Sequence, residues 1–217
     1  GGIGVNLVGS NAVTWLDQAI PAFGTFAMDI GKFLPEASWP NQVEIKAGRY
    51  FVRPRYEVVN SSGKLRIAHA NVERTDLKPD PNIPELTKIM GKGYIMPLPI
   101  LPIEEFNTVV LPTPMSTCQQ ELPLSVMIFD GNGKEIAQKY LGRIARHDST
   151  PVDIDTLLAE SRKSLSTSFG HIEFVYDFRN GGEADGWLHA LAKFKHKKSG
   201  HEAETVFGAH IYNTPIV

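Results

Sequence analysis

The sequence predicts an all-β, mainly antiparallel fold: a β-sandwich, immunoglobulin-like in general architecture, with one α-helix near 151–163 and an irregular apolar N-terminal arm. Several short segments alternate strictly between apolar and polar residues, which is typical of strands with one buried face. Turn sequences rich in glycine, asparagine and aspartate separate these segments. Helices do not alternate with the expected strands, so a parallel α/β sheet is not indicated.

The chain opens with an apolar segment, residues 1–40, that we expect to form an arm or linker. Residues 1–31 contain no lysine or arginine and only two aspartates. Uncovered, such a segment would present a large apolar surface, so we expect it to dock on a partner. The alternative is a first strand that packs on its own domain. The residues expected to dock are Trp15, Leu16, Phe23 and Phe26.

Glycines and prolines interrupt the apolar runs of this segment, and no stretch reaches the ~18 apolar residues that a membrane helix needs. We therefore expect no transmembrane span. The chain begins Gly1-Gly2 without a methionine, which is compatible with a processed end.

Residues 41–217 are expected to form the sandwich domain. A first hairpin is predicted within 43–74, and a second within 121–141, where residues 130–134 read Asp-Gly-Asn-Gly-Lys. The intervening segment, 76–118, is rich in proline and is predicted to be largely irregular, which leaves open a subdivision of the domain there.

One helix is predicted after the second hairpin. Thr150 supplies a capping hydroxyl and Pro151 suits the first helical position. Ile154, Leu157 and Leu158 follow with helical spacing, so one stripe of the helix should be buried.

Residues 169–213 are predicted to form a three-stranded antiparallel meander. Its strands are expected at 171–178, 187–195 and 204–212, each alternating between an apolar and a mixed face. If both turns are symmetric, the register places Asp177, Trp187 and His210 in one row, on the face opposite the core.

The mixed face of this meander is the candidate binding surface for a partner or ligand, formed by Trp187, His189, His210, Asp177 and Tyr212. Two imidazoles and a carboxylate could hold zinc or iron, so His189, His210 and Asp177 are an alternative metal site. The other two interpretations are a small-ligand groove, and a surface covered by a loop, a second sheet or a partner.

Composition narrows the function classes. The 217 residues include 42% hydrophobic and 21% charged residues, as in ordinary globular proteins, and the formal charge of −2 gives no reason to expect nucleic acid. The single cysteine, Cys118, excludes an internal disulfide. No nucleophile or nucleotide-binding motif is present, so we nominate no catalytic residue and no cofactor, and lean against an enzyme.

We therefore expect a non-catalytic binding or structural subunit that docks onto a larger protein assembly. The fold class and the missing methionine favour a periplasmic or extracellular location, with a membrane-associated complex as an open possibility. The alternative function is a metal-dependent or carbohydrate-binding sandwich that uses the His189/His210 face.

Overall fold

The structure is a computed structural model. It describes residues 2–39, 41–47, 55–59, 63, 65–69, 90–114, 121–145, 147–148, 150–177, 179 and 186–211. Side chains are described for all of these except 65–69, 90–96, 114, 122, 186–188 and 206–211.

The chain divides into two compact units, which are treated separately below. The N-terminal unit comprises Gly1–Pro54 together with His147–Ser149. The sandwich unit comprises Arg55–Arg146 together with Thr150–Val217.

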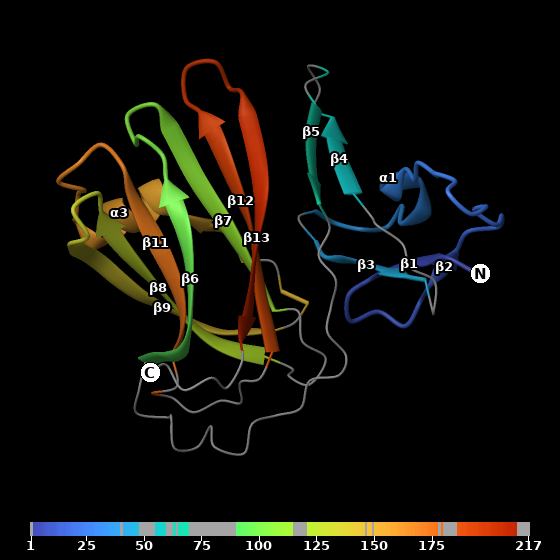
Figure 1. Cartoon of the computed structure of the whole chain (residues 1–217), viewed down its shortest axis with the longest axis horizontal. Helices are drawn as coiled ribbons and strands as arrows, with labels where there is room; N and C mark the ends of the chain where they lie inside the picture. Colours follow the sequence, from blue (N-terminus) through green and yellow to red (C-terminus); the bar gives the residue numbers. More distant parts are fainter. Residues whose placement is uncertain are drawn as a thin grey trace. The chain divides into compact units, whose positions relative to one another are not determined.

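Two four-stranded antiparallel sheets form the body of the sandwich unit (Figure 1). The first sheet has the order β6-β11-β8-β9, with strands β6 (Met90–Ile100), β11 (Gly170–Asp177), β8 (Glu121–Asp130) and β9 (Glu135–Ala145). The second sheet has the order β10-β7-β12-β13, with strands β10 (Val152–Asp153), β7 (Phe106–Pro114), β12 (Gly186–His196) and β13 (Glu202–Ile211).

A single hydrophobic core joins the two sheets. Its buried residues come from β6, β8, β9 and β11 of the first sheet and from β7, β10 and β12 of the second. The predicted β-sandwich is therefore confirmed. Its immunoglobulin-like character is not confirmed, because the sheet orders β6-β11-β8-β9 and β10-β7-β12-β13 are not those of an immunoglobulin domain.

The predicted helix is present as α3 (Ile154–Ser161), and its expected buried stripe is confirmed: Ile154, Leu157 and Leu158 all lie in the core. Its start differs from the predicted one. Residues 152 and 153 form β10, and Asp153 caps the helix by accepting a hydrogen bond from the Thr156 amide at 3.0 Å. A carboxylate at this position replaces the hydroxyl of Thr150.

Hairpins with strong turn sequences are found where they were predicted. β8 and β9 pair around residues 131–134, and β12 and β13 pair with Trp187 opposite His210 and Lys193 opposite Glu204. The hairpin predicted within 43–74 is present as β4 (Arg55–Val59) and β5 (Leu65–His69), which belong to the sandwich unit.

The prediction that the first two strands of the meander pair as a hairpin is wrong. β11 pairs with β6 and β8 in the first sheet, while β12 pairs with β7 and β13 in the second. Both edges of each strand are therefore occupied, and residues 178–185 connect the two sheets instead of closing a hairpin. Consequently Asp177 does not lie in a row with Trp187 and His210.

The proline-rich segment is also more regular than predicted, because β6 and β7 are long strands within it. Pro97 and Pro99 lie on β6, an edge strand whose neighbour is β11. Being two residues apart, they direct their missing amide donors to the same side of the strand. Proline is tolerated on an edge strand where its missing amide would face away from the neighbouring strand, so both residues are compatible with this position of β6.

The N-terminal unit contains a small antiparallel sheet of order β2-β1-β3, from β1 (Gly4–Leu7), β2 (Thr14–Trp15) and β3 (Val43–Lys46). A four-residue helix, α1 (Ile30–Phe33), lies between β2 and β3 in sequence. The segment expected to be an arm thus supplies two strands and a helix, joined by irregular stretches. No helix among the described residues is long and apolar enough to cross a membrane.

Candidate functional site

The candidate surface on the second sheet is only partly placed by the structure. Trp187 pairs with His210 and His189 pairs with Gly208, so all of these residues share one face of the β12–β13 hairpin. Ala190 and Ala192 point into the core, which puts His189 on the outer face. Yet His189 is only 4% exposed. The side chains of Trp187 and His210, and all of Tyr212, lie outside the described part of the chain.

The β4–β5 hairpin lies against this outer face. β5 contacts β13, and the Tyr56 hydroxyl donates a hydrogen bond to Glu204 Oε2 at 3.2 Å. Glu204 pairs with Lys193 and therefore belongs to the same face as His189 and His210. A two-stranded hairpin is only marginally stable alone, so packing on β13 holds it in place. Part of the candidate surface is thus covered by the sandwich unit's own chain.

Asp177 belongs to the other sheet and has a different set of partners. Its side chain is fully buried and accepts hydrogen bonds from Ser125 Oγ at 2.7 Å and from Arg179 Nε at 2.7 Å. The Arg179 guanidinium makes a second contact through Nη2. These hydrogen bonds, led by that from Arg179, lower the pKa of Asp177 although burial opposes the shift. Asp177 is therefore an ionised carboxylate held in a salt bridge.

This placement removes one member of the predicted metal set. His189 and His210 are diagonal neighbours in the second sheet, while Asp177 lies in the first. Among the residues that the structure describes, no three histidine, cysteine or acidic side chains are grouped as metal ligands would be. Arg179 was not anticipated as the partner of Asp177, although their spacing of two residues was visible in the sequence.

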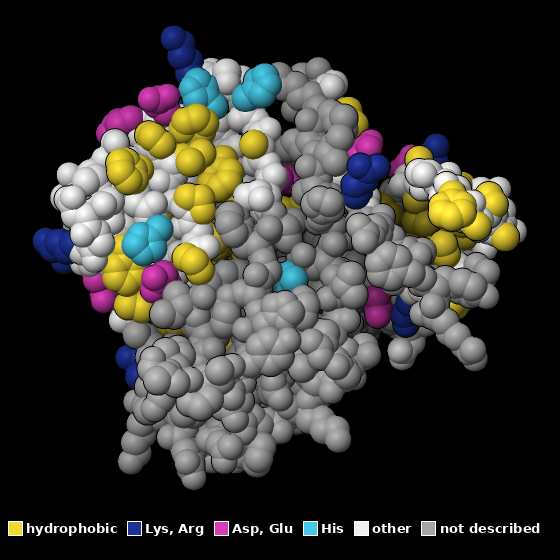
Figure 2. Space-filling model, viewed as in Figure 1, with side chains coloured by type: hydrophobic (Ala, Val, Ile, Leu, Met, Phe, Trp, Pro, Cys, Tyr) yellow, Lys and Arg dark blue, Asp and Glu magenta, His cyan; other side chains and the backbone are white. Residues whose placement is uncertain are grey.

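The predicted docking residues have unequal exposure. Trp15 is 56% exposed on β2, and Phe23 is exposed over its whole side chain at 108%. Phe26 is partly exposed, whereas Leu16 is buried. The prediction missed Trp39, which is 55% exposed and whose position between Ser38 and Pro40 in an irregular stretch was a usable signal. Figure 2 shows hydrophobic side chains gathered on the visible face of the N-terminal unit, at the right of the view.

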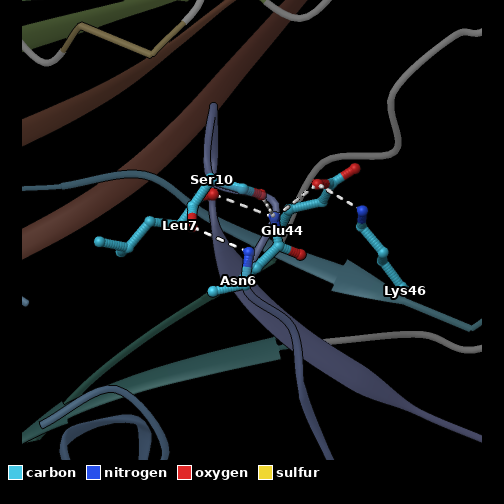
Figure 3. A network of polar contacts seen from close by, with 6 residues as sticks. Asn6, Leu7, Ser10, Glu44 and Lys46 are labelled. Carbon is cyan, nitrogen blue, oxygen red and sulfur yellow. Dashed lines mark hydrogen bonds and ion pairs between the residues drawn. The ribbon is translucent and has the colours of Figure 1, made fainter.

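A buried polar network supports these exposed groups from within the N-terminal unit (Figure 3). Asn6 is 1% exposed, and its Nδ2 donates to the carbonyls of Leu7 and Ser10 and to Glu44 Oε2, at 3.0–3.1 Å. Glu44 Oε2 lies 3.7 Å from Lys46 Nζ. One amide thus ties β1 to the turn after it and to β3.

A second network fixes the turn between β8 and β9. The buried Asp130 accepts hydrogen bonds from the amides of Asn132 and Lys134 at 2.9 and 3.0 Å, and from the Ser166 hydroxyl. These bonds, the one from Ser166 first, lower the pKa of Asp130. The carboxylate closes an Asx-type turn.

Fold and site together define an antiparallel β-sandwich protein with a small N-terminal β-unit that exposes aromatic side chains. No protein-family model matches the chain, and no curated protein or solved structure is significantly similar to it.

Proposed function

We propose that this protein is a non-catalytic binding subunit that docks, through its N-terminal unit, onto a larger protein assembly. The partners are other protein subunits, in the periplasm or outside the cell. Nucleic acid is not among the ligands, because the chain carries a formal charge of −2.

The observation that carries the proposal is the uneven distribution of exposed apolar side chains. Among the residues whose side chains the structure describes, four of the seven exposed large hydrophobic residues lie in Gly1–Pro54, although the sandwich unit contributes more of the described side chains. They are Trp15, Phe23, Trp39 and Ile45, whereas the sandwich unit contributes Val59, Tyr140 and Phe169.

The residue types strengthen this argument. Trp and Phe are enriched in protein interfaces and contribute most of the energy when they enter a pocket on a partner. Exposed side chains of this size cost free energy in water, so a surface that gathers them is typical of a binding site. Two of these residues lie on the small sheet, Trp15 on β2 and Ile45 on β3, and the Asn6 network ties β1 to β3 in that sheet.

The test compares two double variants of the full chain. Trp15→Ser with Trp39→Ser removes exposed aromatic groups of the N-terminal unit, and Tyr140→Ser with Phe169→Ser removes exposed aromatic groups of the sandwich unit. Tagged chains are extracted from the source cells in gentle detergent, and their native mass is measured.

We expect wild type and the sandwich-unit variant to migrate in a larger complex, and the N-terminal variant to migrate as the free chain. Thermal melts of the purified variants check that each is folded. Retention of the complex by the N-terminal variant would contradict the proposal.

A further inference from the structure

Phe23 occupies an unusual backbone position. The Gly24 amide donates to the Pro21 carbonyl at 2.9 Å, so residues 21–24 form a hydrogen-bonded β-turn. Phe23 is the third residue of this turn and has φ +62°, in the left-handed region. Turns with a positive φ at this position normally place Gly or Asn there, and a bulky residue is rare.

The neighbours of Phe23 determine the turn. Pro21 begins it, and a Cβ added to Gly24 would lie 2.9 Å from both the Pro21 carbonyl oxygen and Pro21 Cγ. Only glycine therefore fits at residue 24, and the tight turn directs Phe23 outward.

Among the residues that the structure describes, nothing compensates for this strain. Phe23 is 108% exposed, so its ring makes no packing contact that would favour the strained backbone. Strained residues that persist without a packing role are concentrated at binding and active sites, where the strain presents a group to a ligand. A preformed aromatic projection also loses little conformational entropy when it binds.

The charges around the turn indicate what binds it. Residues 1–31 carry two aspartates, Asp17 and Asp29, and no lysine or arginine, which gives −2 from side chains. Lys32, the first basic residue, lies 3.5 Å from Asp29. Segments that insert aromatics at membrane surfaces use basic residues to approach anionic lipids, and this segment has the opposite sign.

We propose that the turn at residues 21–24 is a preformed anchor that inserts Phe23 into an apolar pocket of a protein partner. The inference rests on the proposed docking function and adds the anchoring residue and the chemistry of the partner.

The first step of the test identifies the partner. A photoreactive benzoylphenylalanine is placed in the full-length chain at residue 15, 23, 39 or 169 in separate experiments, in the source cells. Residue 169 is the control, because Phe169 is an exposed aromatic side chain of the sandwich unit. The protein cross-linked from the N-terminal positions is then purified.

The second step measures affinity for that purified protein. Phe23→Ala and Phe23→Gly should each weaken binding by about tenfold or more, as removal of an interface anchor does. Phe169→Ala should bind like wild type. Glycine suits a positive φ, so the melting temperature of Phe23→Gly should not fall below that of Phe23→Ala.

Each outcome decides the question. If a partner is cross-linked but binds Phe23→Gly as tightly as wild type, the assignment of Phe23 as the anchor is wrong, while the proposed docking function still holds. If no protein is cross-linked from residues 15, 23 or 39, both fail. If wild type cosediments with vesicles of phosphatidylcholine and phosphatidylglycerol and Phe23→Gly does not, the anchor binds lipid and the inference of a protein pocket is overturned.

Discussion

At the scale of single residues, Asp177 shows that a carboxylate side chain can either bind a ligand or stabilise the fold. The predicted register placed its carboxylate in one row with His210 and one row from His189, which suggested a metal ligand. In the structure, Ser125 and Arg179 donate hydrogen bonds to the Asp177 carboxylate oxygens within the sandwich unit. The difference depends on which strand lies beside β11, and alternation of residue types along the chain does not contain that information.

The Asp177 salt bridge predicts a pH-dependent stability. Asp177→Ala should lower the free energy of unfolding at neutral pH by about 1–3 kcal/mol, because it removes buried hydrogen bonds to a charged group. Arg179 is half exposed and can be hydrated, so the loss stays below that of a fully buried pair.

The direction of the pH effect follows from the lowered pKa of Asp177. Its contribution is present above the ordinary value of 3.8 and is lost as the pH falls through the lower folded value. Urea unfolding at neutral pH and at about pH 3 should therefore show the gap between wild type and Asp177→Ala shrinking in acid. Asp17→Ala, at an exposed position, is the matched control. An equal gap at both pH values would contradict the assignment.

At the scale of elements, local turn sequences predicted hairpins well and sheet membership poorly. The β8–β9 and β12–β13 hairpins have short connections, and both form as predicted. The β11–β12 connection has a similar Asn-Gly-Gly signal but leads from one sheet to the other. The prolines likewise led to the prediction of irregular structure in the segment that forms β6 and β7. A missing amide donor matters only where a neighbouring strand would accept its hydrogen bond, and the sequence does not show which strand is the neighbour.

The pairing of β11 with β8 predicts a strong effect at Gly170. A Cβ at this residue would lie 2.2 Å from the Phe129 carbonyl oxygen, a backbone atom that moves only with its strand. Gly170→Ala should lower the free energy of unfolding by about 3 kcal/mol.

The control for this prediction is Gly133, in the β8–β9 turn. Gly133 has φ +78° but no atom within 4 Å of an added Cβ, so Gly133→Ala should cost only about 1 kcal/mol from backbone strain. Urea denaturation compares the two variants. Equal losses would mean that β11 and β8 are less closely paired at this end than the structure shows.

At the scale of the whole molecule, the sandwich unit holds a complete core. Every residue of its hydrophobic cluster lies between Leu98 and Phe194, and none belongs to the N-terminal unit. The sequence indicated an apolar N-terminal segment of about forty residues. The structure extends that unit to Pro54 and adds His147–Ser149, which no local pattern could associate with it.

This division predicts that a chain beginning at Arg55 still folds. Its thermal melt should stay cooperative, with a midpoint within a few degrees of the sandwich-unit transition of the full chain, because no core contact is removed. Differential scanning calorimetry of the two chains makes the comparison. Loss of a cooperative transition would show that the N-terminal unit is needed to fold the sandwich.

The assignment of His147–Ser149 to the N-terminal unit also bears on how such a protein can arise. Gln42 Nε2 donates a hydrogen bond to the Asp148 carbonyl at 2.5 Å, so this unit is built from two separate stretches of sequence. A recombination event that moved residues 1–54 to another gene would leave part of the unit behind. The complete N-terminal unit therefore cannot be transferred to another protein as one continuous segment.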